Sequence, residues 1–324
     1  MPFSVRRLED PDARAFAVLA AAIEADHPTN LQLSAEEFLE IRHLSGAVLE
    51  GAFDGDDLVA WSGYLAQAPR DDGRRIRVFG DVDPAYLGRG LGTLMAARAL
   101  AGARTRHAAD GAGLRATYVT STVAGRTDQA DLVAALGYRP ERYRFTMVAD
   151  LGGLDISPAR HDGYDLVEFD PADSEVLRVA HQRAFSDYPV PMSMTADVWD
   201  TFMIQPRHTR HGLSSWLRDQ ESGEAASYLF SHEYAVPLSG NTDGRETYVP
   251  YLGTLPAHRG RGLASALMSH TLQASRDQGV ARVSLEVDAH NPDGALGFYE
   301  RAGFRTVASF EQCTLTEPPA RSPI

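Results

Sequence analysis

The sequence predicts an α/β protein built from two copies of one domain. A strand-like run, a glycine-rich turn and a helix-like segment follow one another twice, over residues 75–103 and again over 248–280. The two stretches align at an offset of 172 residues, which carries Pro84 onto Pro256. A repeat of this length is too long for a solenoid. It indicates two domains of one kind, which is also the number that 324 residues suggest.

Other segments recur in the same order within each copy. In the first copy residues 12–23 read as a helix, and in the second copy residues 173–185 do. Each of these helices ends before an Asp-x-Pro sequence, which strengthens the repeat. Residues 164–169 alternate like an opening strand, and residues 216–230 read as a hairpin around a polar turn.

The turn of the second copy, Arg259-Gly260-Arg261-Gly262, has the composition of an anion site. Glycine lets the backbone approach a ligand closely, and the helix start that follows offers unpaired N–H groups at its positive end. Arg259 and Arg261 add guanidinium forks that suit phosphate oxygens. The pattern predicts a pyrophosphate site, and a glycine pair before a helix is equally consistent with a tight turn alone.

Two other phosphate-binding loops do not fit this stretch. No Gly-Lys-Ser/Thr sequence is present, which excludes a nucleoside-triphosphate P-loop. A dinucleotide loop needs a third glycine, where this chain has Ala264, and an acidic residue closer than Glu286 or Asp288.

Residues Leu255 to Ala264 resemble the acyl-CoA pyrophosphate loop of the GNAT superfamily of N-acyltransferases, whose pattern is Arg/Gln-x-x-Gly-x-Gly/Ala. A second signature of that superfamily follows in the right order: a strand, an asparagine, and a helix with a tyrosine four residues before Gly-Phe. The residues that match it are Leu285, Glu286, Val287, Asn291, Ala295, Phe298, Tyr299, Ala302, Gly303 and Phe304. Either signature alone would be weak, and the two together make the resemblance specific.

The resemblance implies a fold, a donor and a set of binding residues. Each copy would be a mixed, mostly antiparallel sheet flanked by helices, and the acyl donor would be acetyl-CoA. The cofactor-binding residues that it implies are Leu255, Arg259, Gly260, Arg261, Gly262, Leu263, Ala264, Asn291 and Tyr299.

Two residues after the loop have expected roles in acyl transfer. Tyr299 would protonate the leaving thiolate, because a phenol with a pKa near 10 can give a proton to a departing sulfur. Asn291 would hydrogen-bond the cofactor arm, and as an N-cap ahead of Pro292 it could also begin a helix.

The general base is the least defined part of the predicted site. Glu246 precedes the central strand and is the first candidate, and Glu286 lies on the next strand. His181, His232 and Glu233 are further candidates. Many relatives use ordered water in place of a side chain.

The first copy carries the same turn without the same chemistry. Its loop residues, a possible second CoA site, are Gly88, Arg89, Gly90, Leu91 and Gly92. Leu87 stands where the superfamily has Arg or Gln, and Val133 stands four residues before Gly137, where the second copy has Tyr299. The first copy lacks the proton donor, so we expect a structural or substrate-shaping domain that binds CoA weakly or not at all.

Glycine and proline interrupt any regular pattern between residues 150 and 163, where the repeat places the domain boundary. We predict a degenerate GNAT-like domain over 1–153, a catalytic one over 160–316 and a disordered tail over 317–324. Two equivalent domains could pair within one chain, so a monomer and a homodimer both stay open.

Composition excludes several other classes of protein. Hydrophobic residues make up 44% of the chain, as in globular proteins, and the net charge of −13 argues against nucleic acid or an anionic membrane as partner. The single Cys313 excludes an intrachain disulfide and a cysteine-based metal site, and no His-Glu-x-x-His spacing occurs, so no metal is expected. Without a signal peptide or a long apolar run, the expected location is the cytoplasm.

The sequence therefore predicts an N-acetyltransferase. It would move an acetyl group from acetyl-CoA to a primary amine of a small molecule by direct attack in a ternary complex. One alternative is a CoA-binding regulatory module without turnover, and another is a GNAT-fold enzyme that acylates oxygen or performs other acyl-CoA chemistry. Tyr299 and Asn291 favour an enzyme, because a pure binding module needs no proton donor.

Overall fold

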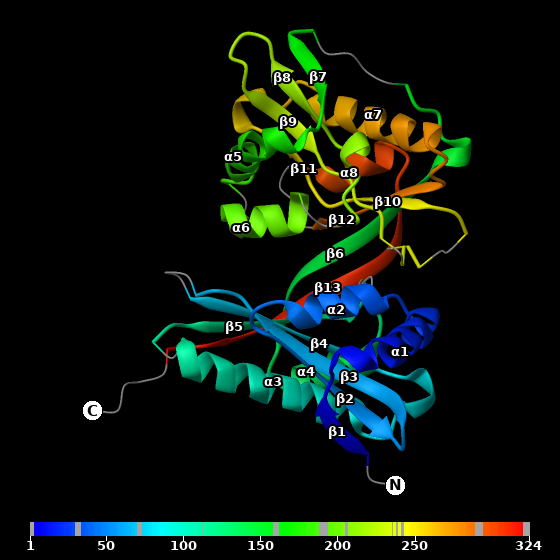
Figure 1. Ribbon diagram of the computed structural model, residues 1–324, viewed down its shortest axis with the longest axis vertical. Helices are drawn as coiled ribbons and strands as arrows, with labels where there is room; N and C mark the ends of the chain where they lie inside the picture. Colours follow the sequence, from blue (N-terminus) through cyan, green and yellow to red (C-terminus); the bar gives the residue numbers. More distant parts are fainter. Residues whose placement is uncertain are drawn as a thin grey trace. The chain divides into compact units, whose positions relative to one another are not determined.

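The computed structural model describes residues 3–29, 34–69, 73–111, 113–157, 162–187, 194–204, 207–234, 236–237, 239–240, 243–288 and 294–319. The chain divides into two compact units (Figure 1). The first comprises Met1–Phe145, Asp288–His290 and Ala308–Ile324, and the second comprises Thr146–Val287 and Asn291–Val307.

The first unit has a mixed, mostly antiparallel sheet in the strand order β1-β2-β3-β4-β5-β13-β6. Its elements are β1 (Ser4–Arg7), α1 (Ala13–Asp26), α2 (Ala35–His43), β2 (Ala47–Asp54), β3 (Asp57–Ala66), β4 (Arg74–Val82), α3 (Leu91–Asp110), β5 (Ala116–Val123), α4 (Thr127–Ala135), β6 (Arg139–Asp150) and, from Ala308 on, β13 (Arg305–Glu317). β1, β2, β3 and β4 pair antiparallel in turn, β13 pairs antiparallel with β5, and β4 and β5 run parallel.

Alternation along β3 gives this sheet two buried faces. Trp61 packs against α1, with its ring centroid 4.9 Å from that of Phe16. Tyr64 points to the opposite face, as strand periodicity requires, and packs against α3. A Cβ on Gly102 of α3 would lie 2.9 Å from the Tyr64 ring, so glycine lets this helix approach the sheet. Figure 1 shows α1 and α2 on one side of the sheet and α3 on the other.

The second unit repeats this plan. Its elements are β7 (Tyr164–Glu168), α5 (Ser174–Ala184), α6 (Ala196–Trp199), β8 (Ser215–Asp219), β9 (Ala225–Leu229), β10 (Glu246–Val249), β11 (Leu252–Thr254), α7 (Leu263–Asp277), β12 (Arg282–Asp288) and α8 (Ala295–Arg301). One sheet has the order β11-β9-β8-β7, and β6, β12 and β10 lie side by side in the other. The core beneath α5 and α6 contains four large aromatic side chains, Trp199, Trp216, Tyr228 and Phe230. These observations confirm the predicted α/β class.

The predicted strand over 248–255 is two strands with different partners. β10 pairs in parallel with β12, and β11 pairs antiparallel with β9. Pro250 and Tyr251 lie between them, and Pro250 has no N–H group for a ladder. The central strand therefore bends away from β12 at this point.

Both units contain the same V-shaped pair of parallel strands, and we use "V" for it below. In the first unit β4 and β5 pair from Arg74↔Ala116 to Arg77↔Val119, and in the second β10 and β12 pair from Glu246↔Arg282 to Val249↔Leu285. Each V has four pairs, after which its two strands no longer pair with each other. The offset of 172 carries Arg74 onto Glu246, so the sequence repeat is also a repeat of strand register.

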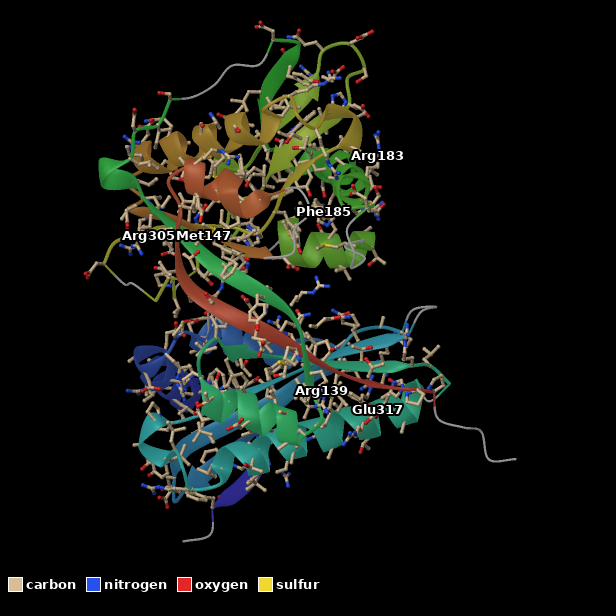
Figure 2. All side chains as sticks on the ribbon, turned by 180° about the vertical axis from the view of Figure 1, so that it is seen from behind. Arg139, Met147, Arg183, Phe185, Arg305 and Glu317 are labelled. Atoms are coloured by element: carbon tan, nitrogen blue, oxygen red, sulfur yellow. The ribbon has the colours of Figure 1, made fainter. Side chains whose placement is uncertain are left out.

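The compact units differ from the contiguous ranges 1–153 and 160–316 at the last strand of each copy. β6 begins in the first unit and its second half, from Thr146, belongs to the second. β13 pairs with β5 of the first unit, from Phe310↔Val123 to Glu317↔Ala116. Figure 2 labels Arg139 and Met147 on β6, and Arg305 and Glu317 on β13, so each strand can be followed. Part of the last strand of each copy therefore belongs to the compact unit formed mainly by the other copy.

The same pairing corrects the start of the predicted tail. Glu317 is the last residue of β13, and its carboxylate accepts hydrogen bonds from Arg104. Residues 320–324 of the predicted tail lie outside the described residues. Within the part of the chain that the structure describes, no helix is long and apolar enough to cross a membrane.

Candidate active site

The glycine turn of the second unit lies at the end of β11 and begins α7. A 3-10 turn at Pro256–His258 leads into it, and Gly260 and Gly262 have φ angles of 74° and 78°. This left-handed conformation favours glycine over other residues. Gly262 is the N-cap of α7 and no side chain caps the helix there. The first-turn N–H groups of a 15-residue helix are therefore open toward an anion.

Arg259 does not offer a free cation to this turn. Its guanidinium forms a two-pronged ion pair with Asp187, with N–O distances of 2.6 and 2.9 Å, and also donates to the Ala184 carbonyl oxygen. The Arg259 hydrogen bonds lower the pKa of Asp187, so the pair stays charged. The role that the structure shows for Arg259 is to tie the loop to the end of α5.

Arg261 is the arginine that stays exposed beside the turn. Its Nη1 donates to the Tyr164 hydroxyl at 2.8 Å. That hydroxyl also bonds His258 Nδ1 at 2.8 Å, and His258 Nε2 bonds Glu224 at 2.9 Å. The chain of contacts from Glu224 to Arg261 orients a positive charge next to the open N–H groups of α7.

The apolar residues of the predicted loop hold it in place. Leu255 and Leu263 are almost completely buried, and Ala264 is half-buried. Leu255 N–H donates to the carbonyl oxygen of Ala226 on β9 at 2.9 Å. These residues set the position of the turn through packing.

The first unit has the same turn with nearly identical backbone angles. Gly88 and Gly90 have φ angles of 73° and 79°. Gly90 is the N-cap of α3, whose first residue is Leu91. Gly92 lies in the first turn of that helix. Arg89, the counterpart of Arg261, lies over the Tyr86 ring with its guanidinium carbon 4.4 Å from the ring centroid. The loop conformation is therefore present in both units.

Tyr299 lies on α8, and its ring meets Phe298 and Phe304 edge-on, with centroids 4.9 and 5.8 Å away. Burial raises the pKa of Tyr299 to about 12. The phenol therefore keeps its proton at neutral pH, as a proton donor must. Asn291 lies outside the described residues.

Glu246 lies at the closed end of the second V and is already paired. It is almost completely buried, its carboxylate is 3.5 Å from Arg282, and it accepts hydrogen bonds from Ser239. Its counterpart in the first V is Arg74, which is also buried and forms an ion pair with Asp110. A paired charge at this position in both copies indicates a structural anchor.

We expect Glu246→Gln to lower stability more than turnover. Removing one partner of a buried ion pair leaves the other charge uncompensated, which costs about 3–5 kcal/mol. Denaturant unfolding measures that loss, and Glu300→Gln, an exposed glutamate of α8, is the control. If Glu246→Gln were as stable as wild type but inactive, the predicted role as base would stand.

A different carboxylate lies where the V opens. Glu286 follows Leu285, the last β12 residue of the V, and is half-buried. Burial raises the pKa of Tyr251 to about 12, with a smaller contribution from the negative charge of Glu286. Tyr251 lies at the bend between β10 and β11. Sequence reasoning named Glu286 as a candidate base; Tyr251 packs against His181, with ring centroids 4.8 Å apart.

The other candidate bases are occupied or weak. His181 is completely buried and its Nδ1 lies 2.6 Å from the Tyr228 hydroxyl. Burial lowers the pKa of His232 to about 3, which makes its imidazole a poor proton acceptor. Glu233 forms ion pairs with both Arg210 and Arg245.

Comparison with known proteins agrees with this geometry. Residues 178–304, from α5 to the end of the second signature, match the model of the acetyltransferase (GNAT) family. This match supports a GNAT protein. Its matched residues include the glycine turn, both strands of the second V, and Tyr299.

A relative and two solved structures align over most of the chain. The chain is 28% identical to a mycothiol acetyltransferase of Thermobispora bispora over 305 residues, which are 93% of this chain and 94% of that one. A GCN5-related N-acetyltransferase structure from Sphaerobacter thermophilus is 26% identical, with a TM-score of 0.78, and the match covers 99% of this chain and 98% of that chain. A tandem GNAT protein from the clavulanic acid biosynthesis pathway superposes with a TM-score of 0.73 at 17% identity, covering 99% and 100% of the two chains, and shows the fold. Together these matches support a tandem GNAT, mycothiol-synthase-like protein, and the family match and the relatives' names indicate an acyl-CoA-dependent N-acyltransferase.

Proposed function

We propose that this enzyme transfers an acetyl group from acetyl-CoA to a primary amine of a small molecule, with its active site in the second unit. The observation that carries the proposal is the combination present in that unit: an open glycine turn, a V of parted strands, and a protonated tyrosine. The first unit has the turn and the V, but Val133 in place of Tyr299. The names of the mycothiol acetyltransferase relatives support a mycothiol-type amine as the first acceptor to test.

The residues of the second unit suit the binding of the donor. The α7 N–H groups and Arg261 would hold the pyrophosphate, and the acyl arm would enter the V where β10 and β12 part. Backbone groups on the two arms of a V no longer pair with one another, so they can bond an extended ligand. Asn291 remains a proposed contact to that arm.

The transfer itself needs two proton movements. The amine nitrogen attacks the thioester carbonyl carbon, the C–S bond breaks, and the thiolate leaves. Tyr299 is proposed to protonate the thiolate, and Glu286 to take the proton that the nitrogen loses. We propose Glu286 for this role because it lies where the V opens, whereas Glu246 lies at the closed end.

The test of the proposed function is turnover with a panel of amines. Release of free CoA thiol should require both acetyl-CoA and an amine, and the product should gain one acetyl group. An amide product resists hydroxylamine, whereas an ester from O-acylation is cleaved by it. Thiol release without an amine, or a hydroxylamine-sensitive product, would contradict transfer to nitrogen.

We expect Glu286→Gln to lower kcat by roughly 10²-fold near neutral pH, the lower end of the usual gain from a positioned acid or base. The defect should shrink as the pH rises, because a larger fraction of the acceptor amine is then already deprotonated. A pH profile of kcat for wild type and variant measures this convergence. Glu300→Gln is the control, and equal profiles for all three proteins would exclude Glu286 as base.

A further inference from the structure

A tyrosine from a distant strand holds the exposed arginine of the second glycine turn. Tyr164 is the first residue of β7, and its hydroxyl oxygen accepts a hydrogen bond from Nη1 of Arg261, 97 residues further along the chain, at 2.8 Å. An exposed arginine without such a contact samples many rotamers, and ordering it on binding costs free energy. The contact therefore orders the guanidinium before a ligand arrives.

The hydrogen bonds behind Tyr164 have one consistent set of donors and acceptors. Arg261 can only donate, so the Tyr164 oxygen accepts from it. The hydrogen bonds from His258 and Arg183 lower the pKa of Glu224, so its carboxylate stays charged and can only accept. Nε2 of His258 therefore donates to Glu224 at 2.9 Å, and Nδ1 of the neutral ring accepts from the Tyr164 hydroxyl at 2.8 Å. Every donor in this chain of contacts meets an acceptor.

Packing and an ion pair keep this network in place. His258 is almost completely buried, and its ring meets the Tyr164 ring edge-on, with centroids 5.7 Å apart. Glu224, directly before β9, also accepts from Arg183 of α5 at 2.7 Å. Tyr164 itself pairs with Asp219 at the end of β8. The Tyr164 hydroxyl is thus fixed by β7, by the turn before α7 and by the start of β9.

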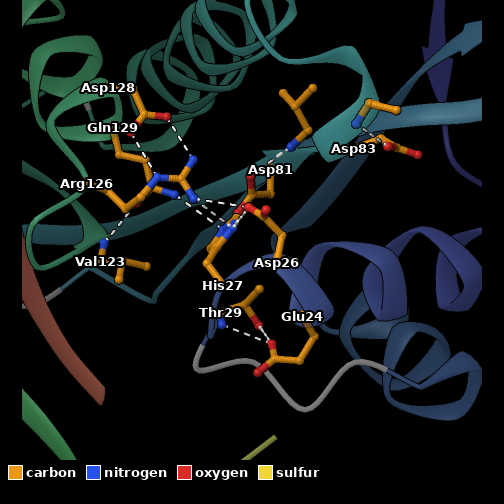
Figure 3. Close-up of polar contacts among 12 residues, drawn as sticks. Glu24, Asp26, His27, Thr29, Asp81, Asp83, Val123, Arg126, Asp128 and Gln129 are labelled. Carbon is orange, nitrogen blue, oxygen red and sulfur yellow. Dashed lines mark hydrogen bonds and ion pairs between the residues drawn. The ribbon is translucent and has the colours of Figure 1, made fainter. Parts of the chain in front are cut away.

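A histidine network of the first unit ends on a neutralised arginine (Figure 3). There His27 lies between Asp26 and Asp81, with nitrogen–oxygen distances of 3.0 and 2.8 Å. Arg126, 3.0 Å from Nδ1 of that histidine, forms a two-pronged ion pair with Asp128, at 2.9 and 2.8 Å. The charge of Arg126 is therefore already taken up by a carboxylate of its own unit.

Arg261 is held without being neutralised. Among the residues that the structure describes, no carboxylate pairs with this guanidinium, whose hydrogen bond goes to a neutral hydroxyl. Arg259, the other arginine of the turn, is paired with Asp187. A neutral acceptor orients a cation and leaves its charge available for a charge-assisted bond to a phosphate. Arg261 is therefore an oriented positive charge beside the open N–H groups of α7.

We propose that Tyr164, fixed by His258 and Glu224, is a positioning residue that directs the charge of Arg261 toward the donor pyrophosphate. It thereby sets a preference for CoA thioesters over shorter thioesters that lack a pyrophosphate. The inference rests on the proposed function, because it takes the glycine turn of the second unit as the donor site. Tyr164 acts through Arg261, so its removal should weaken donor binding only as far as Arg261 contributes to it.

Calorimetry with acetyl-CoA on the full chain tests this role at the site that Gly262→Asp removes. Tyr164→Phe keeps the ring and its edge contact with His258 and removes only the hydroxyl. Its Kd should rise roughly 2- to 10-fold, the usual cost of ordering one long side chain on binding. The control is Arg218→Gln, which removes an exposed positive charge from the neighbouring β8, where it pairs with Asp165, and should leave Kd unchanged.

A double-mutant cycle distinguishes positioning from damage to the fold. Arg261→Gln should raise Kd at least as much as Tyr164→Phe does. Adding Tyr164→Phe to Arg261→Gln should raise it no further, because the hydroxyl then has no guanidinium to position. Additive losses in the double variant, or an unchanged Kd in Tyr164→Phe alone, would overturn the inference.

Donor preference is the second readout. The kcat/KM for acetyl-CoA relative to that for S-acetyl-N-acetylcysteamine, a thioester without a pyrophosphate, should fall in Tyr164→Phe by the same factor as Kd rises. An equal loss with both donors would make Tyr164 a structural residue. The proposed function fails differently: if Gly262→Asp removed no acetyl-CoA site, the donor site of the second unit would itself be wrong. If Gly262→Asp removed the site while Tyr164→Phe bound acetyl-CoA like wild type, only the role of Tyr164 would fall.

Discussion

Gly262→Asp is expected to abolish acetyl-CoA binding and turnover together. The substitution places a carboxylate at the N-cap of α7, where the proposed pyrophosphate would meet the open N–H groups. Two unit charges about 4 Å apart repel by about 4 kcal/mol at an effective dielectric constant near 20. That repulsion corresponds to a rise in Kd of roughly 10³-fold. Calorimetry and thiol release measure the two losses.

Two controls separate the charge from backbone strain. Gly262→Asn has nearly the same size without the charge, and asparagine tolerates the left-handed conformation better than most residues. Gly90→Asp imposes the same change at the matching N-cap of the first unit, where φ is 79° compared with 78° at Gly262. We expect weakened binding in the first control and near wild-type binding in the second. Loss of binding in Gly90→Asp alone would move the cofactor site to the first unit.

Tyr299→Phe is expected to lower kcat by roughly 10²- to 10⁴-fold, the usual contribution of a positioned proton donor. Binding of acetyl-CoA should change little, because the ring and its contacts with Phe298 and Phe304 are retained. Measurements of kcat, together with calorimetric Kd values for acetyl-CoA, separate an effect on turnover from an effect on binding. A raised Kd with unchanged kcat would make Tyr299 a binding residue only.

The pH dependence of kcat should report the protonation of Tyr299. Because burial raises the pKa of Tyr299 to about 12, the phenol stays protonated as the pH rises well above neutrality. The loss of kcat that deprotonation of Tyr299 would cause should therefore begin only near that value. Tyr138→Phe is the control: it occupies the position of Phe304 in the first unit, and its buried hydroxyl has no hydrogen-bond partner.

Much of the architecture could be predicted from local patterns. The glycine turn, the helix that follows it and the hairpin over 216–230 all depend on residues close in sequence. The repeat at an offset of 172 residues predicted two equivalent units, and the register of the two Vs confirms it. The GNAT signatures predicted the superfamily because they combine a loop conformation with a helix at a set distance along the chain.

Long-range pairing decided what the charged residues do. Arg259 and Glu246 both carry the right charge for predicted roles at the site, yet one is held by Asp187 and the other by Arg282. Their partners lie 72 and 36 residues away along the chain. Such an ion pair leaves no periodic pattern in the sequence, because it requires only that two distant elements meet.

The sequence by itself determined the fold class, the repeat and the positions of both glycine turns, since these depend on propensity, periodicity and backbone conformation. The tertiary structure alone decided that β6 and β13 are exchanged between the units, because a strand can pair with any compatible edge. It alone also showed that hydrogen bonds connect Glu224, His258, Tyr164 and Arg261. Tyr164 and Glu224 lie far from the glycine turn in the sequence, and only folding brings their atoms within hydrogen-bonding distance of it.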